Sequence, residues 1–331
     1  MTQKPRVAII GATGIGKHHG KWYAMEGCEV VAFVGSSAES TARTRESMAQ
    51  VFGFEGRAYT NVRDMLAAER PDAVSVCSPH HLHRDHTLAC LDAGAHVLCE
   101  KPLVWDASCT AQGTLADGRS MVSAAARAAR ILAVNTQYVA AVAPCFSLYE
   151  ARRGLLSRIE ALDFRMESKG GIGGPNTYDD IWIDLASHPL SIMLRFLPHA
   201  VLVRDTARCI IRRDQVSARF DMQLPYGSRC PVRIDLRNVY EGAAMARTFG
   251  VNGFLVDLSG GNDDKGVYRT FITADGERVQ CDDLVHTSVR RFAEAARGAG
   301  EPLSTGAEAL RNLEIQLALH QLAERREEAC P

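Results

Sequence analysis

The chain has 331 residues, of which 46% are apolar, and its Lys and Arg nearly balance its Asp and Glu, which leaves a net charge of -1. A single hydrophobic core stops growing near ~250–300 residues, so this length predicts two domains. The balanced charge argues against nucleic acid and anionic membranes as partners and favours a small molecule. No apolar run reaches the ~18–20 residues of a membrane span, and we expect a soluble, cytoplasmic protein.

Short β-rich runs alternate with helical patterns in the first part of the chain. This alternation is typical of βαβ units, which build a parallel sheet with helices on both faces. The right-handed crossover rule then predicts a doubly wound α/β sheet, the Rossmann arrangement. The expected strands cover residues 7–10, 30–34, 73–77, 96–99 and 131–134, and the expected helices 62–69, 84–93 and 106–130.

Apolar residues recur with a period of two in the second part of the chain. Such alternation predicts an antiparallel sheet with one covered face, and Asp275-Gly276 predicts a hairpin turn. We expect a Rossmann domain over residues 1–145 and an α+β substrate-binding and oligomerisation domain over 146–331, which closes with a helix over 307–328. The expected strands cover 162–166, 216–224, 232–236, 254–256 and 268–273.

A glycine-rich turn, Gly11-Ala12-Thr13-Gly14-Ile15-Gly16, follows the first strand and opens a helix. In this context, backbone N–H groups at the helix N-terminus hold a pyrophosphate. Threonine replaces the usual central glycine, and Gly14 is expected to take over part of its role. We therefore assign the turn from Gly11 to Gly16, with Thr13, Gly14 and Ile15, to a dinucleotide. The alternative is a glycine turn without a ligand.

The end of the second strand sets the choice of dinucleotide, because an acidic side chain there binds the ribose diol of NAD. Here the sequence reads Gly35-Ser36-Ser37, without a carboxylate. Ser36, Ser37 and Arg43 can donate to a 2′-phosphate, which favours NADP somewhat over NAD. The alternative for Arg43 is an ordinary solvated helix residue.

At Cys99-Glu100-Lys101-Pro102 the chain resembles the Gfo/Idh/MocA family of sugar and inositol dehydrogenases. The resemblance implies a Rossmann domain followed by a domain with an open-faced, mostly antiparallel sheet. It also implies a homodimer or homotetramer that forms through this sheet. The last helix is expected to pack back toward the Rossmann domain. Three stretches carry the resemblance in family order: GATGIGKHH from Gly11, DAVSVCSPHHLHRDHTLACLDAGAHVLCEKPL from Asp72, and DIWIDLASHPLSIML from Asp180.

The resemblance assigns catalysis to Lys101, Asp184 and His188. Lys101 follows a strand at the carboxyl edge of the sheet, where open α/β sheets bind ligands and a positive charge stabilises a developing alkoxide. Asp184 and His188 are four residues apart and share one face of a helix, which Pro189 kinks or starts. By itself such a pair is more often a surface ion pair. We expect His188 to accept the proton, Lys101 to polarise the oxygen and Asp184 to orient the histidine; in some relatives the lysine moves the proton.

The resemblance also implies cofactor contacts at the turn formed by Ser78, Pro79 and His83, and at Glu100 and Lys101. The lysine would touch both the substrate hydroxyl and the nicotinamide side. The resemblance implies substrate contacts at Gln137 and Tyr138, although the family's usual arginine nearby is absent. We also expect a cluster of polar and aromatic residues to form a substrate-facing edge. The alternative interpretation of this cluster is a loop with an aromatic residue in the core. The cluster consists of Tyr178, Asp179, Asp180 and Trp182.

A zinc site is the competing interpretation of the histidine-rich stretch that includes His80, His81, His83, His86 and Cys90, because His86 and Cys90 have i, i+4 spacing. Hydride transfer to nicotinamide needs no metal when a base is supplied, so we expect none. The ten cysteines include no C-x-x-C pair, and we expect mostly buried thiols in a reducing compartment.

These features predict an NAD(P)-dependent oxidoreductase. It would transfer a hydride between nicotinamide and a secondary alcohol or ketone of a sugar, an inositol or a nucleotide sugar. Two alternatives stay open at this point: an NADPH-dependent reductase of an imine or another non-sugar substrate, and a non-catalytic NAD(P)-binding sensor. Retention of Lys101, Asp184 and His188 together argues against the sensor.

Overall fold

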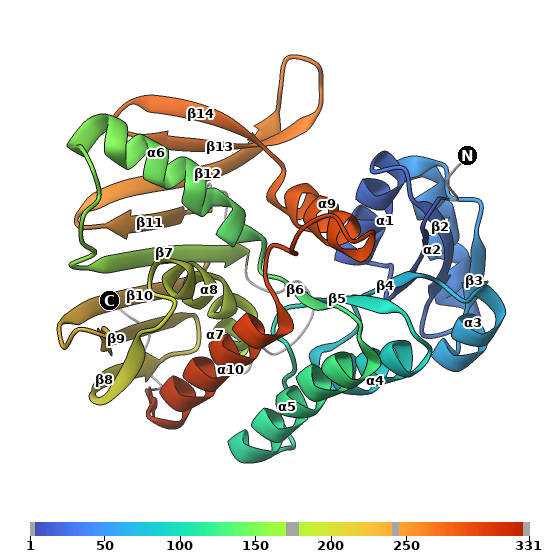
Figure 1. Cartoon of the computed structure of the whole chain (residues 1–331), viewed down its shortest axis with the longest axis horizontal. Helices are drawn as coiled ribbons and strands as arrows, with labels where there is room; N and C mark the ends of the chain where they lie inside the picture. Colours follow the sequence, from blue (N-terminus) through green and yellow to red (C-terminus); the bar gives the residue numbers. More distant parts are fainter. Residues whose placement is uncertain (1–3, 170–178, 240–244, 327–331) are drawn as a thin grey trace. The chain divides into compact units, whose positions relative to one another are not determined.

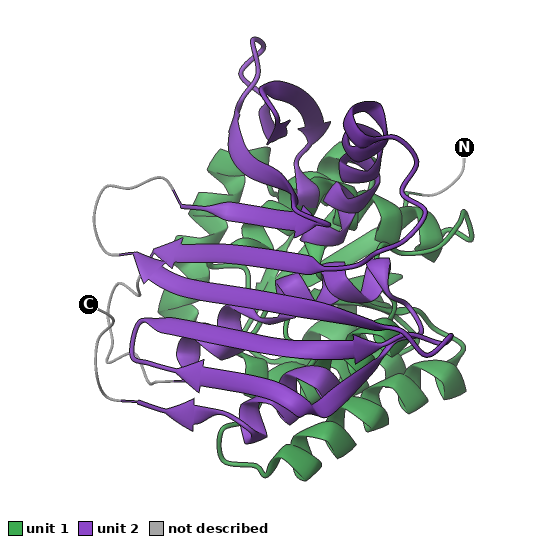
Figure 2. Cartoon of the chain, turned by 90° about the vertical axis from the view of Figure 1, so that its left-hand side faces the viewer, with its two compact units in different colours: residues 1–137, 285–313 green, residues 138–284, 314–331 purple. Residues whose placement is uncertain are grey.

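The structure is a computed structural model that describes residues 4–169, 179–239 and 245–326. Its chain divides into two compact units, unit 1 (Met1–Gln137 and Val285–Leu313) and unit 2 (Tyr138–Leu284 and Glu314–Pro331), which Figure 2 colours separately. The segment after residue 284 thus contributes to both units. The expected division into domains at residue 145 stays a prediction.

Unit 1 is built on a six-stranded sheet whose strands are all parallel (Figure 1). The order β3-β2-β1-β4-β5-β6 reverses direction between β1 and β4, and ligands bind such sheets at the carboxyl ends of the strands beside this point. The expected doubly wound sheet is confirmed. Its strands are β1 (Arg6–Ile10), β2 (Glu29–Val34), β3 (Arg57–Tyr59), β4 (Ala73–Val76), β5 (His96–Glu100) and β6 (Leu132–Asn135).

Local capping explains where the helices of unit 1 begin. The Asn61 side chain accepts from the N–H groups of Arg63 and Asp64, as expected for an N-cap. The helix expected over 106–130 begins later, because Asp106 accepts from the Ser108 N–H in a turn and Thr110 is the N-cap. The helices are α1 (Ile15–Met25), α2 (Ala38–Phe52), α3 (Val62–Glu69), α4 (His83–Asp92), α5 (Ala111–Ala128) and α9 (Leu284–Ala296), with the short η1 (His80–Leu82).

The core of unit 1 includes an element from the far end of the chain. Val289 and Phe292 of α9 are fully buried, and the Phe292 ring meets the edge of Tyr23 at a centroid distance of 6.4 Å. Burial of one such ring is worth roughly 1.5–3 kcal/mol. Unit 1 therefore includes α9 in its hydrophobic core.

Unit 2 contains a nine-stranded sheet in the order β14-β13-β12-β11-β7-β10-β9-β8-β15. Its pairings are antiparallel except for β7 with β10 and β8 with β15, so the expected mostly antiparallel sheet is confirmed. The strands are β7 (Leu162–Lys169), β8 (Val201–Ile211), β9 (Gln215–Gln223), β10 (Arg229–Val239), β11 (Arg247–Val251), β12 (Phe254–Asn262), β13 (Tyr268–Ala274), β14 (Glu277–Asp282) and β15 (Glu324–Arg325).

One face of this sheet is covered within unit 2 and the other is open (Figure 2). On β10, Val232, Ile234 and Leu236 are buried, whereas Arg233 and Asp235 point to the open face and pair with each other. This alternation fits a half-covered sheet. The covering helices are α6 (Val142–Arg153), α7 (Asp180–Leu185) and α8 (Ser187–Phe196).

The hairpin predicted at Asp275-Gly276 is confirmed, because both residues have positive φ, 47° and 78°, between β13 and β14. The helix expected over 307–328 was wrong at its end: α10 (Gly306–Gln321) is followed by β15, which pairs with Ile210 and Ile211 of β8. In the parts of the chain that the structure describes, no helix is both long and apolar enough to cross a bilayer.

Candidate functional site

The glycine-rich turn packs the end of β1 tightly against its neighbours. Gly11 has φ +84°, its N–H donates to Val34 O at 2.9 Å, and a Cβ on it would lie 2.5 Å from Cys77 O. A Cβ on Gly16 would lie 2.3 Å from Gly11 O. These two positions therefore require glycine for steric reasons.

Gly14 differs from these two glycines, because a Cβ on it would meet no atom within 4 Å. It is the N-cap of α1, where no side chain caps the helix and no acidic side chain occupies the first turn. The first N–H groups of a helix need acceptors, and the helix dipole favours an anion there. A pyrophosphate fits this turn, and the N–H groups from Gly14 to Gly16 would hold it beside the half-exposed Ile15 and the Thr13 hydroxyl.

The end of β2 carries the residues expected to choose between NAD and NADP. The Ser37 hydroxyl caps α2 by accepting from the Ser40 N–H, and the Ser36 hydroxyl lies 3.2 Å from the Ser40 hydroxyl. Arg43 forms an exposed ion pair with Glu39 one helical turn away. No carboxylate stands at 35–37, but each of the three expected donors already has a local partner.

His83 joins the ends of two neighbouring strands. Its Nδ1 lies 2.9 Å from Pro102 O and its Nε2 2.8 Å from Ser78 O, and burial lowers the pKa of this histidine. The Ser78 hydroxyl meets His86 Nδ1 at 2.9 Å, and Pro79 precedes η1. Both ring nitrogens of His83 thus contact backbone carbonyl oxygens. The histidine therefore connects the turn after β4 with the turn that contains the cis Lys101–Pro102 bond.

Glu100 is a buried carboxylate at the carboxyl end of β5. Its Oε1 lies 3.0 Å from His19 Nε2 and accepts from Asn135 Nδ2 at 2.6 Å, while its Oε2 accepts from the Lys101 N–H at 3.3 Å. Burial raises the pKa of Glu100, but these hydrogen bonds and the charges of His19 and Lys101 outweigh burial and lower it to about 2. The carboxylate is therefore ionised and fixed directly before Lys101.

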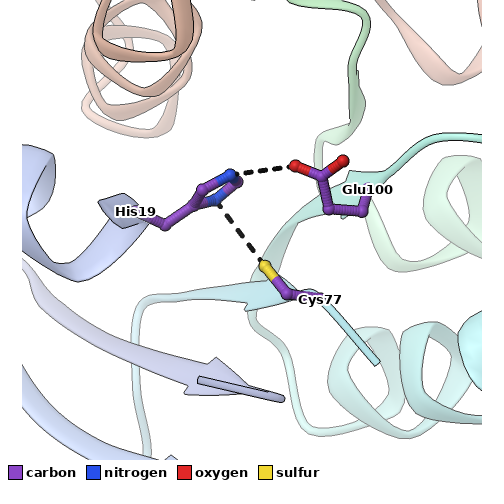
Figure 3. Close-up of side chains that lie close together, drawn as sticks. All are labelled: His19, Cys77 and Glu100. Carbon is purple, nitrogen blue, oxygen red and sulfur yellow. Dashed lines mark hydrogen bonds and ion pairs between the residues drawn. The ribbon is translucent and has the colours of Figure 1, made fainter. Parts of the chain in front are cut away.

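His19, Cys77 and Glu100 form the one group of potential metal ligands found in the described parts of the chain (Figure 3). His19 directs Nε2 at Glu100, whereas its Nδ1 lies 3.8 Å from Cys77 Sγ and 3.0 Å from the Ser75 hydroxyl. Opposite nitrogens of one imidazole cannot bind the same ion. Burial also raises the pKa of Cys77, which keeps it a thiol. In the described residues these contacts form a hydrogen-bond network.

Three consecutive residues at the end of β6 and directly after it carry buried side-chain oxygens without a hydrogen-bond partner among the described residues. These atoms are Asn135 Oδ1, Thr136 Oγ1 and Gln137 Oε1. Asn135 pairs with Glu100 in the sheet register, so the group adjoins the Lys101 turn. Buried polar atoms without partners are costly and commonly mark a ligand or water position.

In unit 2, Tyr138 and His188 meet. Their rings pack edge to face with centroids 4.7 Å apart, and His188 is 5% exposed. Asp184 lies on α7 and His188 on α8, separated by the helical turn at Ala186. Pro189 has no N–H to continue the helix, which explains why a new helix starts two residues before it. The structure thus brings together two residues that the resemblance assigned to the substrate site from separate stretches of the chain.

Trp182 is fully buried in unit 2, and its Nε1 donates to Gln316 O at 3.1 Å. Asp179 pairs with Arg325 and His320. Trp182 therefore fits the alternative interpretation of a core aromatic, and Asp179 belongs to a surface ion-pair cluster. The substrate-facing edge stays a prediction. Tyr178 lies outside the described residues.

Sequence reasoning did not assign a role to His19 or Asn135. A signal existed for His19, because Gly16, His19, Gly20 and Tyr23 follow helical spacing and form the buried face of α1. Asn135 directly follows the strand that the sequence predicts over residues 131–134. Nothing in the sequence indicates that its side chain contacts Glu100.

The all-parallel sheet and the glycine-rich turn after β1 define a Rossmann fold. Residues 5–136 match the family model described as "Oxidoreductase family, NAD-binding Rossmann fold". The D-glucoside 3-dehydrogenase of Escherichia coli (strain K12) is 32% identical over 177 residues, which cover 53% of this chain and 47% of the relative. Over these residues the chain is similar to the Gfo/Idh/MocA family. It spans about half or less of the length of the curated relatives it matches.

Solved structures share the fold over nearly the whole chain. A UDP-N-acetylglucosamine 3-dehydrogenase from Acidithiobacillus ferrooxidans has a TM-score of 0.70 at 21% identity and covers 98% of this chain and 99% of its own. A levoglucosan dehydrogenase in complex with NADH and levoglucosan has a TM-score of 0.74 at 15% identity, with 97% of each chain covered. At identities this low, the structural similarity shows a common fold and nothing further.

Proposed function

We propose that the protein is an NAD(P)-dependent oxidoreductase that transfers a hydride between nicotinamide and a secondary alcohol or ketone of a sugar, an inositol or a nucleotide sugar. The observation that carries this proposal is the buried, ionised Glu100, which fixes Lys101 at the carboxyl edge of the sheet that also bears the glycine-rich turn. The names of relatives support it, since they include a D-glucoside 3-dehydrogenase and a levoglucosan dehydrogenase bound to NADH.

In the proposed reaction, the chain supplies proton transfer and charge stabilisation. The bound nicotinamide accepts or supplies the hydride. When an alcohol is oxidised, His188 accepts the hydroxyl proton, and the Lys101 ammonium stabilises the negative charge that develops on the oxygen. Asp184 orients the histidine. In reduction His188 returns the proton to the oxygen. These roles need no metal ion.

The proposed dinucleotide-binding residues lie at or after the carboxyl ends of four strands, β1, β2, β4 and β5. The turn from Gly11 to Gly16 would hold the pyrophosphate, and Ser36, Ser37 and Arg43 would contact the adenosine ribose. Ser78, Pro79, His83 and Glu100 lie at the turns beside Lys101. We favour NADP over NAD, because residues 35–37 provide no carboxylate to repel a 2′-phosphate. Arg43 would then have to exchange Glu39 for the phosphate.

Gln137 and Tyr138 are the proposed substrate contacts besides the catalytic residues. The Gln137 Oε1 atom is buried without a hydrogen-bond partner in the described ranges, and a substrate hydroxyl would satisfy it.

We also propose a homodimer or homotetramer formed through the open face of the unit 2 sheet, in the cytoplasm. The nine cysteines of the described residues are free, which suits a reducing compartment. Light scattering of the purified protein tests the assembly, because a monomeric mass would contradict it.

The experiment for this function has two stages. Purified protein is first titrated with NADPH and NADH by fluorescence, and then screened with inositols, sugars and nucleotide sugars at the nicotinamide absorbance band. Tight binding followed by turnover supports the proposal and ranks the two dinucleotides. Binding without turnover on any of these substrates contradicts it and leaves imine reduction or a sensing role.

A further inference from the structure

Arg247 occupies an unusual position for a charged side chain. It starts β11 and lies opposite Met166 of β7 in the antiparallel register, so both side chains point to the same face of the sheet. Met166 is fully buried, as is Phe249, which lies two residues along β11 on that face. This is the covered, apolar face of the sheet. Arg247 itself is half-buried, so its guanidinium is partly desolvated at the rim of this face and still reaches solvent.

The contacts of Arg247 do not include an acid in the described residues. Its Nε donates to the Tyr138 hydroxyl at 2.9 Å, its Nη1 to Ala246 O at 3.0 Å, and its Nη2 lies 3.9 Å from Met245 Sδ, a weak acceptor. Three other arginines of the same sheet are paired with acids: Arg165 with Glu167, Arg233 with Asp235, and Arg269 with Asp263 and Asp282.

Arg247 is connected to the proposed base through one residue. The Tyr138 hydroxyl accepts from Arg247, so its own hydrogen is left to donate elsewhere, and no acceptor for it is found among the described residues. The Tyr138 ring in turn packs on His188 at 4.7 Å. A cation and a phenolic donor therefore lie together on the covered face of unit 2, next to the imidazole assigned to proton transfer.

We infer that Arg247 and Tyr138 recognise an anionic group on the substrate, a carboxylate or a phosphate carried by the sugar. This inference rests on the proposed function and narrows its substrate class to acidic sugars. Each Nη of the planar guanidinium carries a second N–H beyond the contacts with Ala246 and Met245, and these donors match the oxygens of either anion. The Tyr138 O–H supplies a further donor, and an anion would pair with a charge that has no acid beside it among the described residues.

The test compares three ligands, D-glucuronate, D-glucose 6-phosphate and neutral D-glucose. Binding to the full chain with saturating NADH or NADPH is measured by isothermal titration calorimetry, for the wild type and for Arg247→Gln and Arg247→Lys. Arg233→Gln is the matched control, since Arg233 lies on the open face of the same sheet. Turnover with the three sugars is followed separately.

The wild type is expected to bind at least one acidic sugar about 10- to 100-fold more tightly than glucose, and the preferred anion distinguishes carboxylate from phosphate. R247Q should abolish that preference, R247K should keep part of it, and R233Q should leave it intact. The inference would be overturned if the wild type bound all three sugars equally or bound none of them. It would also be overturned if both Arg247 variants lost the same amount of affinity for all three sugars. An absence of turnover despite selective binding would contradict the proposed function alone.

Discussion

His19 Nε2 lies 3.0 Å from Glu100 Oε1, and the two side chains are 0% and 7% exposed. The contact ties α1, which begins at the glycine-rich turn, to the end of β5, which precedes Lys101. Asn135 Nδ2 completes it from β6. One buried carboxylate thus connects the proposed pyrophosphate site with the proposed catalytic lysine.

Replacement of His19 by alanine should leave the buried Glu100 carboxylate with only Asn135 and the Lys101 N–H as partners. We expect the free energy of unfolding to fall by about 3–5 kcal/mol, as for other buried pairs that lose one partner. Urea denaturation followed by circular dichroism measures this. His18→Ala is the control, because His18 is exposed and its replacement should change stability by less than about 0.5 kcal/mol. Equal effects of both variants would show that the buried pair contributes nothing.

The acid stability of the protein should depend on Glu100. Its pKa is about 2 in the fold against an ordinary 4.5, so its carboxylate stabilises the fold above about pH 4.5 and loses this contribution as the pH falls toward 2. Between about pH 6 and about pH 4, the wild type should lose roughly 1 kcal/mol more than Glu100→Gln. Unfolding at both pH values measures the difference, and parallel losses in the two proteins would contradict the lowered pKa.

Two glycines of the nucleotide turn should respond differently to alanine. Gly14→Ala places a methyl group in open space, so stability should change by less than about 1 kcal/mol while affinity for the dinucleotide falls at least about tenfold. Gly16→Ala places its methyl group 2.3 Å from Gly11 O, and it should cost about 2–3 kcal/mol of stability. Thermal unfolding and NADPH titration separate the effects. Unchanged affinity in the Gly14 variant would place the phosphates elsewhere.

The sequence predicted the elements whose patterns are local. The parallel strands of unit 1, the alternating strands of unit 2 and the Asp275-Gly276 turn follow from period and turn chemistry alone. The end of α10 could not be predicted in this way, because its helical pattern continues where the chain instead pairs with β8. Pairing between distant segments leaves no local signal.

The same limit applies to the candidate site. Strand ends and motifs identified Lys101, Tyr138 and His188, and the contact between the last two was open to prediction only through the resemblance. Arg247 is 109 residues from the tyrosine it contacts, and its own strand reads as an ordinary short strand. Trp182 was ambiguous for the opposite reason, since aromatic residues look alike in sequence whether they stack on a sugar or fill a core.

The central claim, that this chain transfers a hydride with the help of Lys101, is tested most directly by the turnover of Lys101→Ala. The substrate and dinucleotide are those found active with the wild type, and Lys265→Ala, at an exposed loop position, serves as the control. We predict that K101A binds the dinucleotide as the wild type does but loses about 10²–10³-fold or more in kcat, because it lacks the charge that stabilises the developing alkoxide. Near-normal turnover in K101A would contradict the account.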